Sequence, residues 1–434
     1  MSAAPGRDWL AARHRAAARA LRRAVSATGL IHTRTGFGWT VRPAPGSILA
    51  STRNAHWDPE PDYFHHWVRD AAIALRAMPE AIAADPASRA FWLQAAADHI
   101  RFSLAISDPS HRGPETNPLS PFTQADHLAF LRPDEELATL AGAGWLEEPR
   151  FAADGGPDLE RWARPQDDGP ALRASALMTL LDATPELAGP EAETLIARDL
   201  AHIARVAGRP CIGPWEEEPA RRTSFTLIAQ WDALDRGARR EAARGQVVPG
   251  RRSAAERAAG LIAVAADRPT GGWRESIEAG AGHLDSATIL ALLHADRSEG
   301  PFALDAPRTL ATVAALEASF GGLYPLNRGR AVPAIGRWAE DRFFGGNPWY
   351  PVTLGFAELH YRIAALRQDA GSWAKAEAWM ALIEEVAPEG EDLPEQFHRE
   401  TGAPVSCRAL TWSAAAFLGA AAAREAALQA MRSR

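Results

Sequence analysis

Residues 334–359, AIGRWAEDRFFGGNPWYPVTLGFAEL, contain the two features that decide the fold. The first part is a long loop rich in Gly and aromatic residues. In the second part, Val352, Phe356 and Leu359 recur at i, i+4 and i+7, the spacing of one apolar face of an α-helix. The stretch therefore predicts a helix that is entered from a long, chemically varied loop.

The same combination of loop and helix recurs along the chain. Leu177, Leu180 and Leu181 follow helical spacing, the helical stretches are rich in Ala, and alternating β-strand patterns are scarce. Loops longer than about 15 residues are uncommon and are often functional. Long Gly- and Pro-rich loops are expected at residues 107–126, 152–171, 207–222, 268–283 and 322–350.

These patterns bear on the number of domains. The chain has 434 residues, a length that would allow about three domains of ordinary size. Helical patterns run from Asp8 to Ala430, and no Ser- or Pro-rich linker divides them. We therefore expect one all-α domain over residues 1–434. The most linker-like part, residues 236–260, is interpreted either as a linker or as a long surface excursion.

Composition excludes several classes of protein. Apolar residues make up 47% and charged residues 23% of the chain, as in soluble globular proteins. The formal charge is −7, and no basic stripe of the kind found in nucleic-acid binders is present. No apolar run approaches the ~20 residues of a membrane span, and the first thirty residues lack the apolar core of a signal peptide. We expect a cytoplasmic protein whose cysteines, Cys211 and Cys407, are buried free thiols.

Two carboxylates lie in loops beside aromatic residues. Glu216 follows Trp215 in the sequence WEEE, and Glu395 precedes the last apolar helix. Taken alone, each is more simply a solvated loop residue. Together they suit glycoside hydrolysis, in which one carboxyl group protonates the leaving oxygen and the other activates water or attacks directly. An apolar neighbour such as Trp215 favours the neutral form that a general acid needs. The residues predict a two-carboxylate glycosidase and leave the sugar open.

Aromatic residues support the same interpretation. Many tryptophans lie in or beside the loops, where they either anchor the loop or line a sugar pocket. The segment PDYFHHWVRD ends in Arg69 and Asp70, and WARPQDDGPALR contains Asp168; capping and turn chemistry is the alternative for both. The loop tryptophans are Trp57, Trp67, Trp162, Trp215, Trp273, Trp338 and Trp349.

In these segments the chain resembles the glucoamylases, glycoside hydrolase family 15. Six stretches are similar to motifs of that family, in the family's order and over nearly the whole chain. The resemblance implies an (α/α)6 barrel of six helical hairpins, with the site in the loops at one end. The stretches are GSILAS with PDYFHHWVRDAAIAL, RWARPQDDGPALRA (161–174), PWEEEPARRTSFT, HLDSATILALLH (283–294), AIGRWAEDRFFGGNPWYPVTL (334–354) and EQFHRETGAPVSCRALTWS (395–413).

Carried over by position, the resemblance implies a role for each site residue. Glu216 would be the general acid and Glu395 the general base. Asp70 and Arg69 would hold the 4- and 6-hydroxyls of the terminal glucose, and Arg337 would hold hydroxyls next to the cleaved bond. The other implied residues are Glu217 near the leaving sugar, Tyr63, Trp67, Trp162, Trp215, Trp338 and Trp412 around the pocket, and Asp168 and Trp349 as supports.

The implied reaction is exo-acting, inverting hydrolysis of terminal α-linked glucose from malto-oligosaccharides or soluble α-glucans, with release of β-glucose. One alternative is a family-15 enzyme for isomaltose, dextran or trehalose, because the chain departs from the family pattern at Gly213, Glu218, Trp338, Ala339 and Ala409, around the leaving-group side. The other alternative is a non-catalytic sugar-binding or regulatory helical module.

Further expectations concern metals, cofactors, partners and additional domains. His65 and His66 are adjacent and have no third ligand at a fitting spacing, so we expect them to pack or bind hydroxyls and expect no metal. No cofactor, no nucleic-acid or membrane partner and no starch-binding domain are expected. We expect a monomer.

Overall fold

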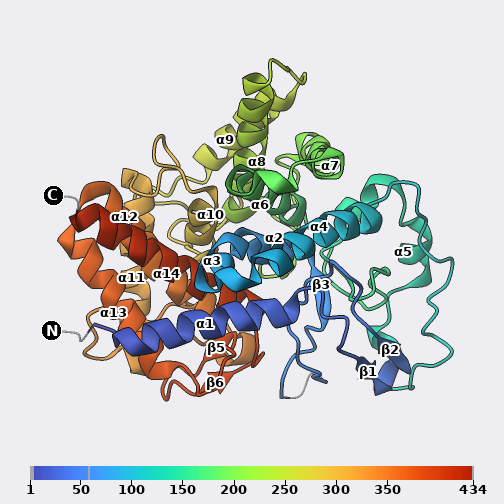
Figure 1. Ribbon diagram of the computed structural model, residues 1–434, viewed down its shortest axis with the longest axis horizontal. Coiled ribbons are helices and arrows are strands. Elements are labelled where there is room, and N and C mark those ends of the chain that lie inside the picture. The colour runs from blue at the N-terminus through green and yellow to red at the C-terminus, as the bar shows by residue number, and fades with distance from the viewer. Residues whose placement is uncertain (1–3, 57–58, 433–434) are drawn as a thin grey trace.

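The computed structural model describes residues 4–56 and 59–432, so Trp57 lies outside the described residues. Its centre is a closed ring of six inner helices, each packed against the next, with the last returning to the first (Figure 1). The inner helices are α2 (Val68–Arg76), α6 (Asp168–Ala183), α8 (Ser224–Ala243), α10 (Ala287–Ala295), α12 (Tyr350–Arg367) and α14 (Thr411–Arg432).

Outer helices cover this ring. Helix α1 packs on α14, α4 packs on α7, and the others pack on the inner helix that precedes them in the chain. This arrangement is the (α/α)6 barrel, so the expected fold class is confirmed. The outer helices are α1 (Arg7–Ala24), α4 (Arg89–Ile106), α7 (Pro190–Val206), α9 (Arg251–Val264), α11 (Pro307–Leu323) and α13 (Ala370–Val386).

Burial distinguishes the two layers. Most residues of α12 are buried, including Val352, Phe356 and Leu359, because neighbouring helices surround it. Fewer than half of the residues of the outer helix α9 are buried. Apolar contact with neighbours on all sides therefore identifies the inner ring.

Short elements occupy the loops. Antiparallel pairs join β1 (His32–Arg34) to β2 (Trp39–Val41), β3 (His65–Trp67) to β4 (Arg150–Ala152), and β5 (Gln396–Phe397) to β6 (Pro404–Val405). Two short helices are α3 (Met78–Ala84) and α5 (Asp134–Thr139). Single 3-10 turns are η1 (Thr35–Phe37), η2 (Pro86–Ser88), η3 (Leu128–Phe130), η4 (Gly142–Leu146), η5 (Pro185–Leu187), η6 (Pro325–Asn327) and η7 (Phe343–Gly345).

Four of the five expected long loops lead into inner helices, whereas the loop at 107–126 connects α4 to η3. The expected loops 152–171, 207–222, 268–283 and 322–350 precede the N-terminal ends of α6, α8, α10 and α12. Strand β3 leads directly into α2 in the same way. The chemically varied loops are therefore attached to the starts of the inner helices.

Residues 236–260 are not a linker. Helix α8 continues to Ala243 and α9 starts at Arg251, so the segment is a helical hairpin that projects from one side of the barrel (Figure 1). The Arg251 guanidinium pairs with Glu241 at 2.8 Å and holds the hairpin together. The surface-excursion interpretation holds because the Ala- and Arg-rich sequence favours helix on both sides of the turn.

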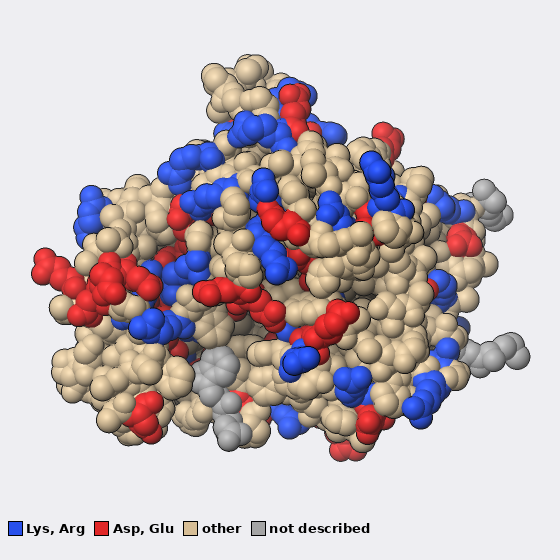
Figure 2. Space-filling view, turned by 180° about the vertical axis from the view of Figure 1, so that it is seen from behind, with Lys and Arg blue, Asp and Glu red and all other residues tan. Residues whose placement is uncertain are grey.

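The surface matches the composition. Basic and acidic side chains are interspersed over the face shown in Figure 2. Within the described ranges, no helix is both long enough and apolar enough to span a membrane.

Truncation of Phe356 tests whether α12 belongs to the inner ring of helices. Phe356→Ala removes a fully buried ring and should lower the free energy of unfolding by about 3–5 kcal/mol. Leu366→Ala is the matched control on the same helix, because Leu366 is 48% exposed. Urea unfolding followed by circular dichroism measures both. Equal stability of the two variants would contradict the assignment of α12 to the core.

Candidate active site

A pocket of about 310 Å³ lies where the inner helices α2, α12 and α14 begin. It brings together nearly all the residues that the resemblance implied, although they come from segments far apart in the chain. Ala50, Pro214, Phe343 and Leu410 complete the lining, and sequence reasoning did not single them out. The expected residues that line it are Tyr63, Trp67, Arg69, Asp70, Trp162, Trp215, Glu216, Glu217, Arg337, Trp349, Glu395 and Trp412.

Local structure explains part of this convergence. Trp67 ends β3, and Arg69 and Asp70 lie in the first turn of α2. A Cβ atom at Gly169 would come within 2.9 Å of the Val68 side chain, so glycine lets the starts of α2 and α6 touch. The close approach places Arg69 next to the first turn of α6.

Glu216 accepts four N–H donors. Trp67 Nε1, Arg69 Nη2 and Gln166 Nε2 donate to its Oε1 at 2.8, 3.2 and 3.1 Å, and Trp162 Nε1 donates to its Oε2 at 2.8 Å. The backbone of Glu216 is in the left-handed region, with φ 63°. Such strained conformations cluster at functional sites, and here the conformation is accompanied by a side chain fixed from four directions.

Trp215 lines the same pocket as Glu216, but its indole N–H is directed to another acid. Trp215 Nε1 donates instead to both carboxyl oxygens of Asp285, at 2.9 and 2.8 Å, and its ring stacks on Trp412 at 6.2 Å. Burial raises the pKa of Asp285 to about 7, against the effect of the Trp215 hydrogen bond. Asp285 therefore orients Trp215, and the neighbours of Glu216 are donors from other loops.

Glu395 lies opposite Ser406 because β5 pairs with β6, with Gln396 facing Val405. The Ser406 hydroxyl donates to Glu395 Oε2. Burial raises the pKa of Glu395 to about 7, although Ser406, the Arg337 charge and a hydrogen bond from Tyr63 lower it. Glu395 is thus a buried carboxyl group at which protonation changes near neutral pH.

Arg69 and Asp70 leave two polar atoms ready for a ligand. Arg69 contacts Gln166 at 3.1 Å and Asp168 at 3.4 Å, while its Nε has no hydrogen-bond partner in the described structure. Asp70 Oδ2 likewise accepts no hydrogen bond from a described residue, although it lies 3.5 Å from Arg69 Nε, and burial raises the pKa of this carboxyl group to about 6. Buried polar groups are normally hydrogen-bonded. A sugar hydroxyl, which both donates and accepts, would satisfy these atoms.

Arg337 is held by acids and surrounded by rings. Its Nε donates to Asp341 at 2.8 Å, and its Nη2 lies 2.9 Å from Glu217. The guanidinium is 4.4 Å from the Trp338 ring and 5.4 Å from the Trp349 ring. Its orientation toward the pocket is therefore fixed.

Trp338 lies beside the sugar pocket and Asp168 lies behind it. The Trp338 ring packs over Arg337 and lines a neighbouring cavity of about 240 Å³. This neighbouring cavity also contains Asp285 and shares Trp215, Glu216 and Glu217 with the sugar pocket. Asp168 lies behind the pocket and accepts from Arg69, as a supporting residue would. Trp349, expected as a support, lines the pocket directly.

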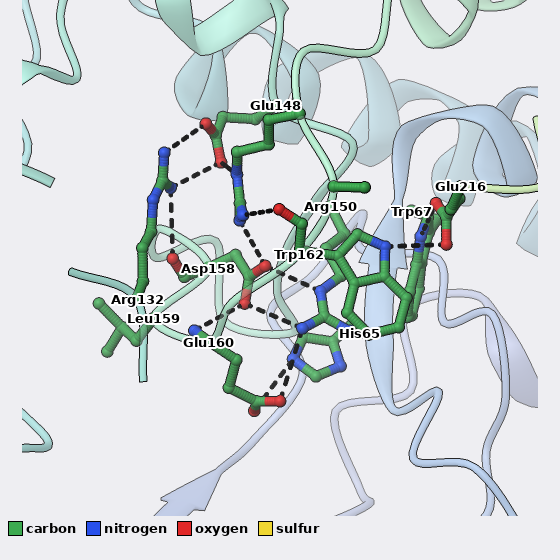
Figure 3. Close-up of polar contacts among 12 residues, drawn as sticks. His65, Trp67, Arg132, Glu148, Arg150, Asp158, Leu159, Glu160, Trp162 and Glu216 are labelled. Carbon is green, nitrogen blue, oxygen red and sulfur yellow. Dashed lines mark hydrogen bonds and ion pairs between the residues drawn. The ribbon is translucent and has the colours of Figure 1, made fainter. Parts of the chain in front are cut away.

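A buried ionic cluster lies behind the two tryptophans that hold Glu216 (Figure 3). Arg150 faces Trp67 across the β3–β4 pair and is bound by Asp158 at 2.8 Å. Its guanidinium lies 3.8 Å from the Trp162 ring and 4.9 Å from the Trp67 ring. A cation over an indole face is attractive, so Arg150 fixes both rings whose N–H groups point at Glu216.

Sequence reasoning missed several of these residues. Gln166 lies inside the quoted motif WARPQDDGPALR, which was a usable signal, and Asp285 lies inside HLDSATILALLH. Ser406 is recognisable only once the β5–β6 pairing places it opposite Glu395. Arg150 lies in EEPRFAADGG, a segment that also resembles the family, but it was assigned no role.

The remaining expectations concern histidines and cysteines. His65 Nδ1 lies 3.1 Å from Arg34, and His66 Nδ1 accepts from the Ile48 amide at 3.0 Å, so both pack within loops. Cys211 and Cys407 are buried free thiols, as expected. No metal-binding cluster of His, Cys, Asp and Glu occurs among residues 4–56 and 59–432.

Removal of the Asp285 carboxyl group tests the support of Trp215. Asp285→Ala leaves a buried indole N–H without an acceptor and should cost about 1–3 kcal/mol of unfolding free energy. Asp285→Asn keeps an oxygen acceptor and should lose less. Urea unfolding and the NMR signal of the Trp215 indole N–H measure both. An unchanged indole signal in Asp285→Ala would contradict the contact.

Comparison with known proteins agrees with this geometry. Glucoamylase-1 of Arthroderma benhamiae is 27% identical over 88% of this chain, and Glucoamylase P of Amorphotheca resinae is 29% identical over 86%. The chain spans 64% of the length of each of these relatives. The solved Hormoconis resinae glucoamylase is 25% identical with a TM-score of 0.75, over 96% of this chain and 73% of that one. The Hypocrea jecorina glucoamylase has a TM-score of 0.77 at 23% identity, over 96% and 72%, which supports the fold.

The family model of glycosyl hydrolases family 15 matches residues 141–422, a segment that contains Glu216, Arg337, Glu395 and Trp412. The match covers more than half of the chain and includes Glu216 and Glu395. The chain belongs to glycosyl hydrolases family 15.

Proposed function

We propose that the protein is an exo-acting, inverting glucoamylase that releases β-glucose from the non-reducing ends of malto-oligosaccharides and soluble α-glucans. The observation that carries the proposal is one pocket containing Glu216 and Glu395 beside the Arg69–Asp70 ion pair, whose Nε and Oδ2 make no hydrogen bond with any described residue. Two carboxyl groups with hydroxyl-binding groups between aromatic walls suit glycoside hydrolysis. The names of the relatives support the α-glucan substrate.

The size of the pocket favours the end of a chain. Its volume of about 310 Å³ is at the lower limit of the ~300–1,000 Å³ usual for ligand pockets. A terminal glucosyl unit would lie among Tyr63, Trp67 and Trp412, with its hydroxyls on Arg69 and Asp70. Cleavage would then release one glucose at a time.

Glu216 is the proposed general acid. Among the described residues, Trp67, Arg69 and Gln166 donate to its Oε1, and Trp162 donates to its Oε2. Oε2 therefore keeps a lone pair that can carry the proton. From this atom the proton would pass to the glycosidic oxygen as its bond to the sugar carbon breaks.

Glu395 is the proposed general base. Held by Ser406 and Tyr63, it would take a proton from a water molecule that attacks the opposite face of the sugar. The new bond forms on the side away from the bond that breaks, so the anomeric configuration inverts. Arg337 stabilises the ionised form that this role needs.

Sugar binding would change the contacts of the proposed general acid. In the free pocket Glu216 accepts from four donors, one of which is Arg69. Arg69 is the donor that a sugar would redirect, because its Nε lies 3.5 Å from Asp70 and makes no hydrogen bond with any described residue. Binding of the terminal hydroxyls would therefore draw Arg69 away from Glu216 Oε1.

Product analysis tests the proposed reaction. Maltose and maltotriose should be cleaved faster than isomaltose and trehalose, and proton NMR should detect β-glucose as the first product. β-Glucose is expected because the water molecule activated by Glu395 attacks the sugar from the face opposite Glu216. Initial formation of α-glucose would contradict inversion, and preferred cleavage of isomaltose or trehalose would favour the other family-15 activities.

Substitution of the two carboxyl groups tests their participation. Glu216→Gln and Glu395→Gln should each lower kcat on maltotriose by about 10²–10⁴-fold, the usual contribution of a general acid or base. Glu218→Gln is the control, since Glu218 lies in the same acidic run and is exposed outside the sugar pocket. Near-normal rates in both site variants would favour the non-catalytic binding module.

Ser406→Ala distinguishes the base from the acid. Because the Ser406 hydrogen bond lowers the pKa of Glu395, its loss should raise that pKa above about 7. A base must be ionised, so the acid limb of kcat/KM, which reports the free enzyme, should lie near pH 7 and move to higher pH. Movement of the alkaline limb instead would assign the acid role to Glu395.

A further inference from the structure

A further pocket, separate from the neighbouring cavity that Trp338 lines, shares a wall with the sugar pocket. This side pocket has a volume of about 510 Å³ and, like the sugar pocket, is lined by Trp162. Its other walls come from the β1–β2 hairpin and from the loop around η3. Nothing in the reaction described above uses it.

The floor of the side pocket is polar and buried and contains groups of both charges. Arg34, 3% exposed, donates to Asp62 Oδ2 at 2.6 Å, and its Nε lies 3.5 Å from Glu160 Oε1. Burial raises the pKa of Glu160, whereas Asp62, despite its burial, is held at a pKa of about 2 by His32 and Arg34. An anion would meet the two acids and a cation would meet Arg34, so the floor suits a neutral ligand.

Two atoms of this floor lack hydrogen-bond partners. Arg34 Nη1 is an unused donor, and Glu160 Oε1 accepts no hydrogen bond from any residue the structure describes. Figure 3 shows Glu160 beside His65 and Arg150, below the Trp162 ring. Leaving buried polar atoms unpaired is costly, and a hydroxyl group, which donates and accepts, would satisfy both.

The opposite side of the pocket is aromatic. Phe37 and His127 meet edge to face at 5.4 Å, and His127 meets Phe130 at 6.3 Å. Phe130 is 59% exposed. The loop is held against the β1–β2 hairpin, because the backbone N–H of Gln124 donates to the Gly36 carbonyl at 2.8 Å. The contact is close, since a Cβ atom at Gly36 would come within 2.3 Å of the His127 ring.

We propose that the side pocket is a second, non-catalytic binding site for glucosyl units of an α-glucan. The proposal rests on the proposed function for its ligand class. Aromatic rings would cover the C–H faces of the sugar, while Arg34 and Glu160 would bind its hydroxyls. Because Trp162 lines both pockets, the ligand of the side pocket is expected to be the same glucan whose end enters the active site. Long substrates would therefore be held at two places and maltose at one.

The test compares substrates of different length. Phe130→Ser should raise KM for maltoheptaose about fivefold, the loss expected from roughly 1 kcal/mol of ring contact, and leave kcat and all constants for maltose unchanged. Phe122→Ser is the matched control, because Phe122 lies in the same loop, is 66% exposed and does not line the pocket. Equal effects of Phe130→Ser on both substrates, or no effect on either, would overturn the proposal.

A ring-shaped glucan separates this site from the active site. β-Cyclodextrin has no chain end, so titration calorimetry should detect it bound outside the catalytic pocket in the full chain and in Phe122→Ser, but not in Phe130→Ser. No binding to the unchanged protein would overturn the second site even where maltose is hydrolysed. Phe130-dependent binding without hydrolysis of maltose or maltoheptaose would support the site and refute the proposed function.

Discussion

The fold depends on one constraint, namely that six inner helices close into a ring with their N-terminal ends together. Every long loop that enters an inner helix then ends at the same place. The partial positive charge of helix N-termini favours carboxylates there, and Asp70 and Asp168 lie in first helical turns while Asp285 closely precedes one. The fold thus gathers acids at one end before any side chain has a catalytic role.

Tryptophan N–H groups orient the carboxyl groups that lie at this end of the barrel. Trp67 and Trp162 direct N–H groups at Glu216, and Trp215 directs its own at Asp285. Arg150 lies over the faces of the first two rings. Each indole therefore contributes an apolar face and one fixed donor. Rings alone would form a wall for sugar, but their edges also fix where the carboxyl oxygens point.

Much of the fold was predictable from sequence, because helical spacing such as Val352, Phe356 and Leu359 is a local property. Placement of the site residues relied on motifs in fixed order. Pairings formed only by folding were not predictable, such as the hydrogen bond from Trp215 to Asp285 and the packing of Trp338 on Arg337. The linker interpretation of 236–260 failed because helix propensity on both sides outweighed its Gly and Pro.

Trp162 connects the two pockets. Its N–H holds Oε2 of Glu216, the oxygen proposed to carry the proton, and its face lies against Arg150. The same side chain lines the side pocket. A glucosyl unit bound there would contact the opposite side of the residue that orients the acid. Because Arg150 and Glu216 already hold this indole from two directions, occupation of the side pocket can add affinity for a long chain without changing the position of the acid.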